Sequence, residues 1–412
     1  MENLKNDLLD GINKSVQNKQ KIIEFVKKYT MLIVLVIVFG FFTLKTNGML
    51  LQPANITSLI LQNAYVFVLA TGMLLCILTG GNIDLSVGSV VCFVGAVGAQ
   101  MLTKFDMGIG ATVLIMLAVG TLIGAFQAFW IAYVRIPPFI VTLAGMLIFR
   151  GLSNVVLNGQ TVSLNKEETF LKIFGGGAEC YIPDFFNNPD INLTCLIAGI
   201  LAMVIFVVLQ LKSRVTRISK GYEVEKTAVF FGRLCAIAAV ILAFSIELAL
   251  DRGIPTPLIW VMLVIVIYAY ITSNTKTGRY FYAVGGNEKS TQLSGINTNK
   301  VYFLAYTNMG FLAAFAALLT IARQSTSTPQ AGQNYEMDAI ASCFIGGASA
   351  YGGIGTVPGV IIGAVLMGVI NIGMSLMSVD QNYQKVVKGA VLLVAVIFDV
   401  VSKRSGKLIV NQ

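Results

Sequence analysis

The chain has 412 residues, of which 56% are hydrophobic and only 12% are charged, whereas a soluble domain carries about 25% charged residues. Twelve spans of about 20 residues would use about 240 positions, so the composition indicates an all-α, polytopic membrane protein and excludes an ordinary water-soluble globule. The absence of histidine excludes imidazole catalysis and imidazole metal ligands. The net charge of +9 is also found in nucleic-acid-binding proteins, but the apolar excess argues against that partner.

The amino-terminal segment 1–28 is polar and carries six lysines, so we expect it to lie in the cytoplasm. The apolar run 31–44 follows without a small-residue cleavage site and predicts an uncleaved first span rather than a signal peptide. We expect a transmembrane domain over 29–402 and a cytoplasmic tail at 403–412. The further candidate spans are 56–79, 86–103, 109–134, 138–157, 191–211, 233–250, 255–273, 301–322, 339–352, 354–378 and 386–402.

The distribution of Lys and Arg gives the expected topology. With the amino terminus inside, the predicted cytoplasmic segments hold 20 basic residues and the external segments hold eight, Lys388 among them. Because positive residues collect in cytoplasmic loops, this split favours twelve crossings with both termini inside, and ten crossings would pass the same test. We therefore predict about 10–12 transmembrane helices.

Three loops of this topology stand out. The external loop 158–190 is polar and has an acidic excess, so it is either a docking surface for an external partner or a plain solvated loop. The segment 212–232 is predicted to be a basic cytoplasmic loop. The cytoplasmic segment 274–300 is the third.

The segment 274–300 contains the signals of a short helix. Gly285 and Gly286 are expected to break the chain, after which Asn287 is a good N-cap and Glu288 suits a helix N-terminus. The helix is predicted to run to Ser294, with Gly295 as its stop. A helix this short needs support, which packing on another protein would supply. A free loop remains the alternative.

The region 339–378 is almost continuously apolar and rich in glycine, and its first part is a candidate re-entrant segment. Gly355, Gly359 and Gly363 form a small-residue face that favours close helix packing, while the same residue type permits broken helices beside a cavity. The stretch 346–364 is also similar in sequence to 80–96, because both contain a Gly pair followed by the motifs G-[ST]-V and G-A. Such a similarity is typical of transporters built from two related halves, although glycine-rich helices also produce it by chance.

Four ionisable residues lie in the apolar runs or at their edges, namely Asp84, Arg150, Glu247 and Asp399. They require an explanation, because a charge at the bilayer centre costs about 2.5–3.5 kcal/mol. Asp84, Glu247 and Asp399 lie near predicted span ends, where an interfacial location suffices. Arg150 lies deeper and is the better candidate for a structural or gating pair, with a partner that the sequence does not identify.

The sequence lacks the G-x-x-x-x-G-K-[ST] phosphate loop and any recognisable nucleophile–base set. We therefore predict no catalytic residue, no metal site and no enzyme activity in this chain. A transporter of this kind must use an ion gradient or an ATPase on another subunit.

Four stretches together resemble bacterial ABC-transporter permeases of the ribose/galactose/xylose and branched-chain amino-acid superfamily, most closely the xylose and multiple-monosaccharide permeases. Pro255-Thr256-Pro257 after Arg252-Gly253, and the added spans around 191–250, carry the closer likeness. The four stretches are GGNIDLSVGSV (80–90), RIPPFIVTLAGMLIFRGLS (135–153), GRYFYAVGGNEKSTQLSGI (278–296) and DAIASCFIGGASAYGGIGTVPGVIIGA (338–364).

The resemblance implies a subunit of the bacterial cytoplasmic (inner) membrane that imports a monosaccharide, such as xylose. It implies a partner ATP-binding subunit that holds ATP and Mg, an extracytoplasmic sugar-binding protein, a second copy of the chain and surrounding lipid, and no cofactor in the chain itself. The implied ATPase-coupling residues are Gly278, Arg279, Gly286, Asn287, Glu288, Ser294 and Gly295. The implied translocation or structural residues are Asp84, Ser86, Gly88, Arg150, Gly346, Gly347 and Gly355.

Two other classes remain open from the residues. An ion-coupled secondary transporter or facilitator would place several acidic groups at mid-span, and these are sparse. A polytopic membrane enzyme would need acidic pairs or metal ligands, which the sequence lacks.

Overall fold

The computed structural model describes residues 31–410, apart from 187, 189–190 and 223, and leaves the side chains of 398–399 and 401–410 undescribed. The predicted amino-terminal segment 1–28 lies outside the described residues. The last helix continues past residue 402, so the predicted tail at 403–412 is helical as far as 410.

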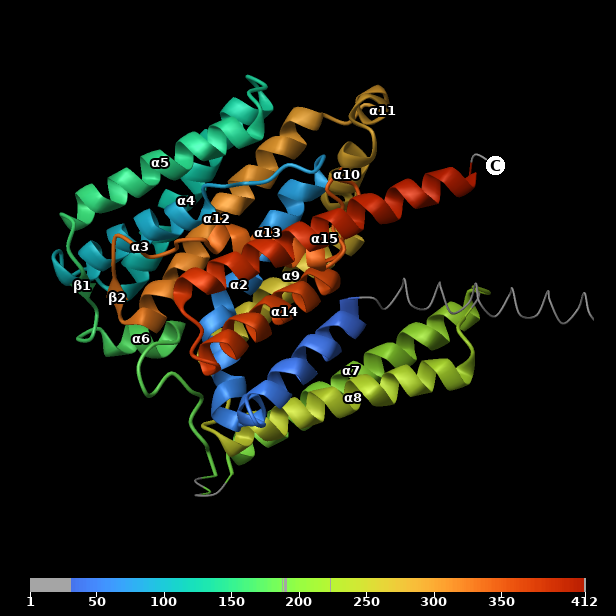
Figure 1. Cartoon of the computed structure of the whole chain (residues 1–412), viewed down its shortest axis with the longest axis horizontal. Coiled ribbons are helices and arrows are strands. Elements are labelled where there is room, and N and C mark those ends of the chain that lie inside the picture. Colours follow the sequence, from blue (N-terminus) through green and yellow to red (C-terminus); the bar gives the residue numbers. More distant parts are fainter. Residues whose placement is uncertain (1–30, 187, 189–190, 223, 411–412) are drawn as a thin grey trace, which may run out of the picture.

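The described chain is a bundle of helices that run in roughly one direction, with one two-stranded ribbon (Figure 1). Figure 1 shows β1, β2 and α6 at one end of the bundle and α10 and α11 at the other. In chain order the elements are a helix Met31–Lys45, η1 (Met49–Leu51), α2 (Pro53–Leu78), α3 (Val87–Thr103), α4 (Ile109–Ala132), α5 (Pro138–Leu157), β1 (Val162–Ser163), α6 (Glu168–Phe174), α7 (Leu193–Ser219), α8 (Thr227–Leu250), α9 (Thr256–Asn274), α10 (Lys276–Gly286), α11 (Glu288–Leu293), α12 (Thr298–Gln324), β2 (Thr326–Ser327), α13 (Tyr335–Ile345), α14 (Val357–Leu376) and α15 (Gln381–Val410).

Eight of the described helices are long and apolar enough to cross a membrane, namely α2, α4, α5, α7, α8, α9, α12 and α14. Each of the other four predicted spans also overlaps a helix, two of which are the shorter apolar helices Met31–Lys45 and α3. The prediction of a polytopic helical membrane protein is therefore confirmed. The placement of the termini in the cytoplasm stays a prediction.

The core lies around α2 and α12, whose side chains are the most completely buried of the eight spans. α12 packs against α2, α3 and α4, and α2 also contacts α9, α13 and α14. By contrast, α7 and α8 form a largely exposed hairpin at the edge of the bundle (Figure 1). A small apolar cluster joins this hairpin to α2 through Ile60, Cys195 and Leu248.

The prediction of a complete span at 339–352 is wrong. α13 ends at Ile345 after 11 residues, which is about 16 Å of helix and about half of a hydrocarbon layer. Residues 346–356 then form an irregular loop before α14. The helix is therefore broken, as the glycine content allowed, because the loop backbone finds its hydrogen-bond partners inside the protein.

α13 and α14 pack closely through two members of the predicted glycine ladder. A side chain on Gly359 would overlap the carbonyl oxygen of Gly346, and one on Gly363 would overlap that of Ser342. Gly355 lies in the loop before α14 rather than on the helix, so its inclusion in the ladder is wrong.

Two segments predicted to be loops are ordered. α7 continues to Ser219 and α8 begins at Thr227, so most of 212–232 is helical; Lys and Arg are good helix formers, and Arg217 suits the last turn. In the segment 158–190, β1 pairs with β2, and α6 buries three apolar side chains and supports the indole of Trp260 through the carbonyl of Ile173. This part of the chain is not a plain solvated loop.

The α13–α14 contact gives a test of packing. Gly363→Ala should lower the thermal unfolding midpoint of the purified protein, because overpacking costs about 1–3 kcal/mol. Gly151→Ala in α5 has no atom within 4 Å of the added carbon and should leave the midpoint unchanged or raise it, since alanine favours helix by up to about 1 kcal/mol. Equal shifts of the two midpoints would contradict the packing described.

Candidate functional site

The segment after α9 folds into two successive helices. α11 starts at Glu288 and is capped by Asn287, whose side-chain oxygen accepts from the backbone N–H of Ser290 at 2.9 Å. It ends at Leu293, and Gly295 follows with a φ of +82°, so the predicted short helix and its stop are confirmed.

The predicted chain break at Gly285 and Gly286 is wrong, because both residues belong to the last turn of α10. Thr275 caps this helix by accepting from the N–H of Gly278 at 3.0 Å. Gly278 itself lies tight against the carbonyls of Ile271 and Thr272 at the corner between α9 and α10. Two glycines at a helix end cost less than two in its interior, which explains why the helix persists through them.

A polar network holds α11 against the bundle. Arg135, in the turn between α4 and α5, forms an ion pair with Glu288 at 2.8 Å and also donates to Asn299. Glu288 in turn accepts from Thr298 at 3.1 Å and from Tyr302 at 3.2 Å. The network therefore joins the α4–α5 turn, α11 and the start of α12.

The charge of Glu288 is favoured by this network. Partial burial raises the pKa of its carboxyl group, but the hydrogen bond and charge of Arg135 and the bonds from Thr298 and Tyr302 outweigh burial, so the pKa lies below its usual value. The ion pair is consequently present at neutral pH and is lost only as the pH falls through that lowered pKa.

The outer surface of α11 is available for contact. Leu293 is 90% exposed, so this large apolar side chain can contact another molecule. Three other residues of the predicted coupling set, Arg279 in α10 and Ser294 and Gly295 after α11, are also exposed. The network thus fixes the inner side of α11 and leaves an apolar tip outward.

The segments 80–96, 274–300 and 346–364 meet where α10 ends. We call this contact the glycine junction and define it by Gly80, Gly81, Gly285, Gly286, Gly352 and Gly353. The N–H of Gly353 donates to the carbonyl of Leu78 at 3.1 Å, and a side chain on Gly285 would overlap that carbonyl and the Gly353 nitrogen. Gly81 lies equally close to the carbonyl of Ala350. The segments 80–96 and 346–364 therefore contact each other, and α10 contacts both.

Tyr282 adds a side-chain link to the junction, because its hydroxyl donates to the carbonyl of Gly355 at 2.9 Å. Gly286, one of the residues predicted to couple to an ATPase, is exposed, yet its nitrogen would crowd a side chain on Gly353. Gly347 is exposed and has no atom within 4 Å of an added carbon, so it is apart from the junction.

Asp84 is 3% exposed and lies inside the protein, and its predicted location near the membrane interface stays a prediction. Its carboxylate accepts from the N–H and the hydroxyl of Ser86 at 2.8 and 2.6 Å. The amide of Gln127, in α4, reaches Ser86 at 3.0 Å. These bonds supply the partners that a buried carboxylate needs.

The irregular segment 328–334 gives Arg150 its partners. The guanidinium donates to the carbonyl of Ala331 at 2.6 Å and to that of Pro329 at 3.2 Å. Gly88 contacts the same segment, because a side chain there would overlap the carbonyl of Gly332. Arg150 thus supports non-helical backbone inside the bundle through carbonyl oxygens.

Sequence reasoning missed a buried ion pair. Lys388 of α15 lies 2.9 Å from the carboxylate of Asp338, which is 1% exposed, and the hydroxyl of Tyr65 donates to the same carboxylate at 2.7 Å. Lys388 therefore lies in a helix and not in a loop, while its placement on the external side of the membrane stays a prediction. Nothing in the local sequence signals a contact between α2, α13 and α15. Arg135, by contrast, could have been singled out from the sequence, because it is the one basic residue between the spans 109–134 and 138–157.

The Arg135–Glu288 contact predicts how α11 is held. Arg135→Gln and Glu288→Gln should each accelerate hydrogen exchange of the amides at 288–295 about two- to fivefold, since a partly exposed ion pair contributes up to about 1 kcal/mol. The double variant should exchange no faster than either single one, measured by mass spectrometry, and Lys300→Gln should match the wild type. Additive effects of the two substitutions would show that they act through different contacts.

Comparison with known proteins identifies a family whose model covers most of the chain. A family model described as "Branched-chain amino acid transport system / permease component" matches residues 55–396, a range that includes the glycine junction, α10, α11 and the buried ion pair. No solved structure matches the chain.

Named relatives cover nearly the whole chain. The xylose transport system permease protein XylH of Escherichia coli K12 is 36% identical over 377 residues, or 91% of this chain and 92% of the relative. XylH of Haemophilus influenzae is 35% identical over 91% of this chain and 96% of its own length. The ribose import permease protein RbsC of Escherichia coli K12 is 34% identical over 84% of this chain and 85% of its own length. The chain therefore belongs to the family of branched-chain amino acid transport system permease components, as a multi-pass membrane permease similar to those of bacterial sugar importers.

Proposed function

We propose that the chain is the translocation subunit of an ATP-driven importer for a monosaccharide, xylose or a related pentose or hexose. Relatives named for xylose and ribose transport support the sugar class. Because the sequence lacks a phosphate loop, ATP and Mg would bind to a separate ATP-binding subunit. The observation that carries the proposal is α11, a short helix fixed on its inner side that presents Leu293 outward.

In this proposal α11 docks into the ATP-binding subunit. A six-residue helix is too short to persist alone, and here the Asn287 cap and the Arg135–Glu288 pair hold it before any partner binds. Preorganisation of this kind lowers the ordering cost of docking. Leu293 would fill an apolar pocket of the partner, as buried apolar anchors do at protein interfaces.

Motion of α11 would reach the bundle through two routes. The Arg135–Glu288 pair leads to the turn between α4 and α5, and the glycine junction leads to α2 and to the loop between α13 and α14. Because the junction is a contact between backbones, it leaves little room for sliding. ATP-driven closure of the partner would therefore rock these helices and alternate the access of the sugar path.

The opposite end of the bundle would receive a sugar-binding protein. There β1, β2 and α6 form an ordered cover (Figure 1) whose sequence has an acidic excess. A second copy of the chain would complete the path, and the binding protein would select the sugar.

An ion-coupled transporter or facilitator is the second candidate, and the buried Asp338–Lys388 pair is the observation that favours it. Intramembrane ion pairs of this kind serve proton or ion relays in such proteins. Reconstitution of the chain with and without an ATP-binding subunit and a sugar-binding protein separates the two. The proposal expects labelled xylose or ribose uptake only with both partners and ATP, and uptake by the chain alone would refute it.

The role of α11 has its own test. Leu293→Asp should abolish at least nine-tenths of ATP-driven sugar uptake, because it places a charge in the docking contact, while membrane insertion and thermal stability stay unchanged at this exposed position. Ser294→Ala, at the next exposed residue, is the matched control and should retain most of the uptake. Normal uptake by Leu293→Asp would remove α11 from the coupling contact.

A further inference from the structure

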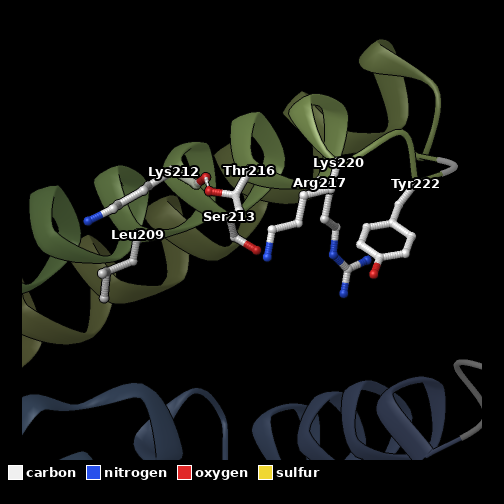
Figure 2. Close-up of a pocket in the computed structure, with 7 residues that line it drawn as sticks. All are labelled: Leu209, Lys212, Ser213, Thr216, Arg217, Lys220 and Tyr222. Atoms are coloured by element: carbon white, nitrogen blue, oxygen red, sulfur yellow. Dashed lines mark hydrogen bonds between the residues drawn. The ribbon is translucent and has the colours of Figure 1, made fainter.

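The turn between α7 and α8 carries a large hollow that the transport proposal does not use. It has a volume of about 780 Å³ and is lined by Leu209, Lys212, Ser213, Thr216, Arg217, Lys220 and Tyr222. Figure 2 shows the side chains of Lys212, Arg217, Lys220 and Tyr222 extending from this end of the hairpin into open space. In Figure 1 this end of the hairpin lies at the same end of the bundle as α11.

Two other basic residues of the hairpin, Arg214 and Arg233, are engaged in contacts within it. The guanidinium of Arg214 lies 4.4 Å from the ring centroid of Phe230 and donates to Thr227. Arg233 pairs with Glu225 at 3.1 Å. Within the described residues, Lys212, Arg217 and Lys220 carry no hydrogen bond or ion pair from their side chains and are exposed. Three positive charges therefore border one hollow, and none of the described residues that line it is acidic.

The hollow sits at the edge of an apolar surface of membrane thickness. Residues 193–211 of α7 contain no charged side chain, and 19 helical residues span about 28 Å, close to the roughly 30 Å of a hydrocarbon layer. Lys212 is the next residue. Above it in the helix, Ile205, Val208 and Leu209 are exposed, and Leu209 also lines the hollow. The basic residues consequently lie at headgroup depth, directly below a surface that faces acyl chains.

We propose that this hollow is a binding site for the headgroup of an anionic phospholipid. Lys212, Arg217 and Lys220 would pair with phosphate oxygens, which bind strongly to ammonium and guanidinium groups. Ser213, Thr216 and Tyr222 supply hydroxyl groups for the remaining polar atoms of the headgroup. Leu209 and the apolar face of α7 would contact the acyl chains. A lipid is the occupant that uses both the charge and the adjoining apolar surface.

The test measures lipid binding to the full chain in detergent by native mass spectrometry. Wild-type protein should retain dioleoylphosphatidylglycerol in preference to dioleoylphosphatidylcholine. The triple variant Lys212→Gln, Arg217→Gln, Lys220→Gln should bind the anionic lipid about 100-fold more weakly, as expected for three basic side chains at an anionic surface. Its affinity for the neutral lipid should not change.

Matched variants distinguish lipid binding at this hollow from a non-specific effect of the net positive charge of the protein. Lys45→Gln, Lys104→Gln, Lys166→Gln removes three exposed positive charges elsewhere and should keep wild-type binding, as should Lys212→Arg, Arg217→Lys, Lys220→Arg. Arg217→Gln alone should weaken binding about fivefold, as expected for about 1 kcal/mol per basic side chain, and serves if the triple variant does not fold. Undiminished binding by the hollow variants, equal loss in the Lys45 triple control, or displacement of the lipid by inorganic phosphate at the same concentration would overturn the proposal.

Discussion

The structure depends on one close contact between backbones, at the point where α2, α10 and the loop before α14 meet. The carbonyl of Leu78 accepts from Gly353, and Gly285 lies so near both that no side chain fits. Hydrogen-bonded backbone contacts of this kind are stiff, because interiors at this density have no free volume to absorb a shift. The helix that presents Leu293 is therefore tied to the most buried helix of the bundle.

The same junction explains why the core tolerates a broken helix. α13 spans only about half of a membrane, and the loop that follows must satisfy its backbone inside the protein. Gly353 does so through Leu78, and Gly355 does so through Tyr282. Arg150 performs the equivalent task for the irregular segment before α13, by donating to two carbonyls. The polar groups buried in the bundle thus hold its non-helical parts.

Much of this architecture could be predicted from the sequence, because long apolar runs are a local signal. The twelve runs all overlap helices, and α11 follows from the cap at Asn287 and the stop at Gly295. What escaped prediction depends on contacts between distant segments. The length of α13, the carbonyl partners of Arg150 and the pairing of Lys388 with Asp338 are set by packing. Gly285 illustrates the limit, since glycine indicates a chain break locally but here permits a close approach of two backbones.

The contact at the glycine junction should make α11 and the loop before α14 move as one body. Spin labels at Ser294 and Tyr351, both exposed, would measure the distance between these segments by pulsed electron paramagnetic resonance. The chain would be assembled with its ATP-binding and sugar-binding partners, with and without ATP. The account predicts the same distance distribution in both states, while a pair from Ser294 to the exposed end of α5 at Asn158 changes. A shift of several ångströms between Ser294 and Tyr351 would contradict it.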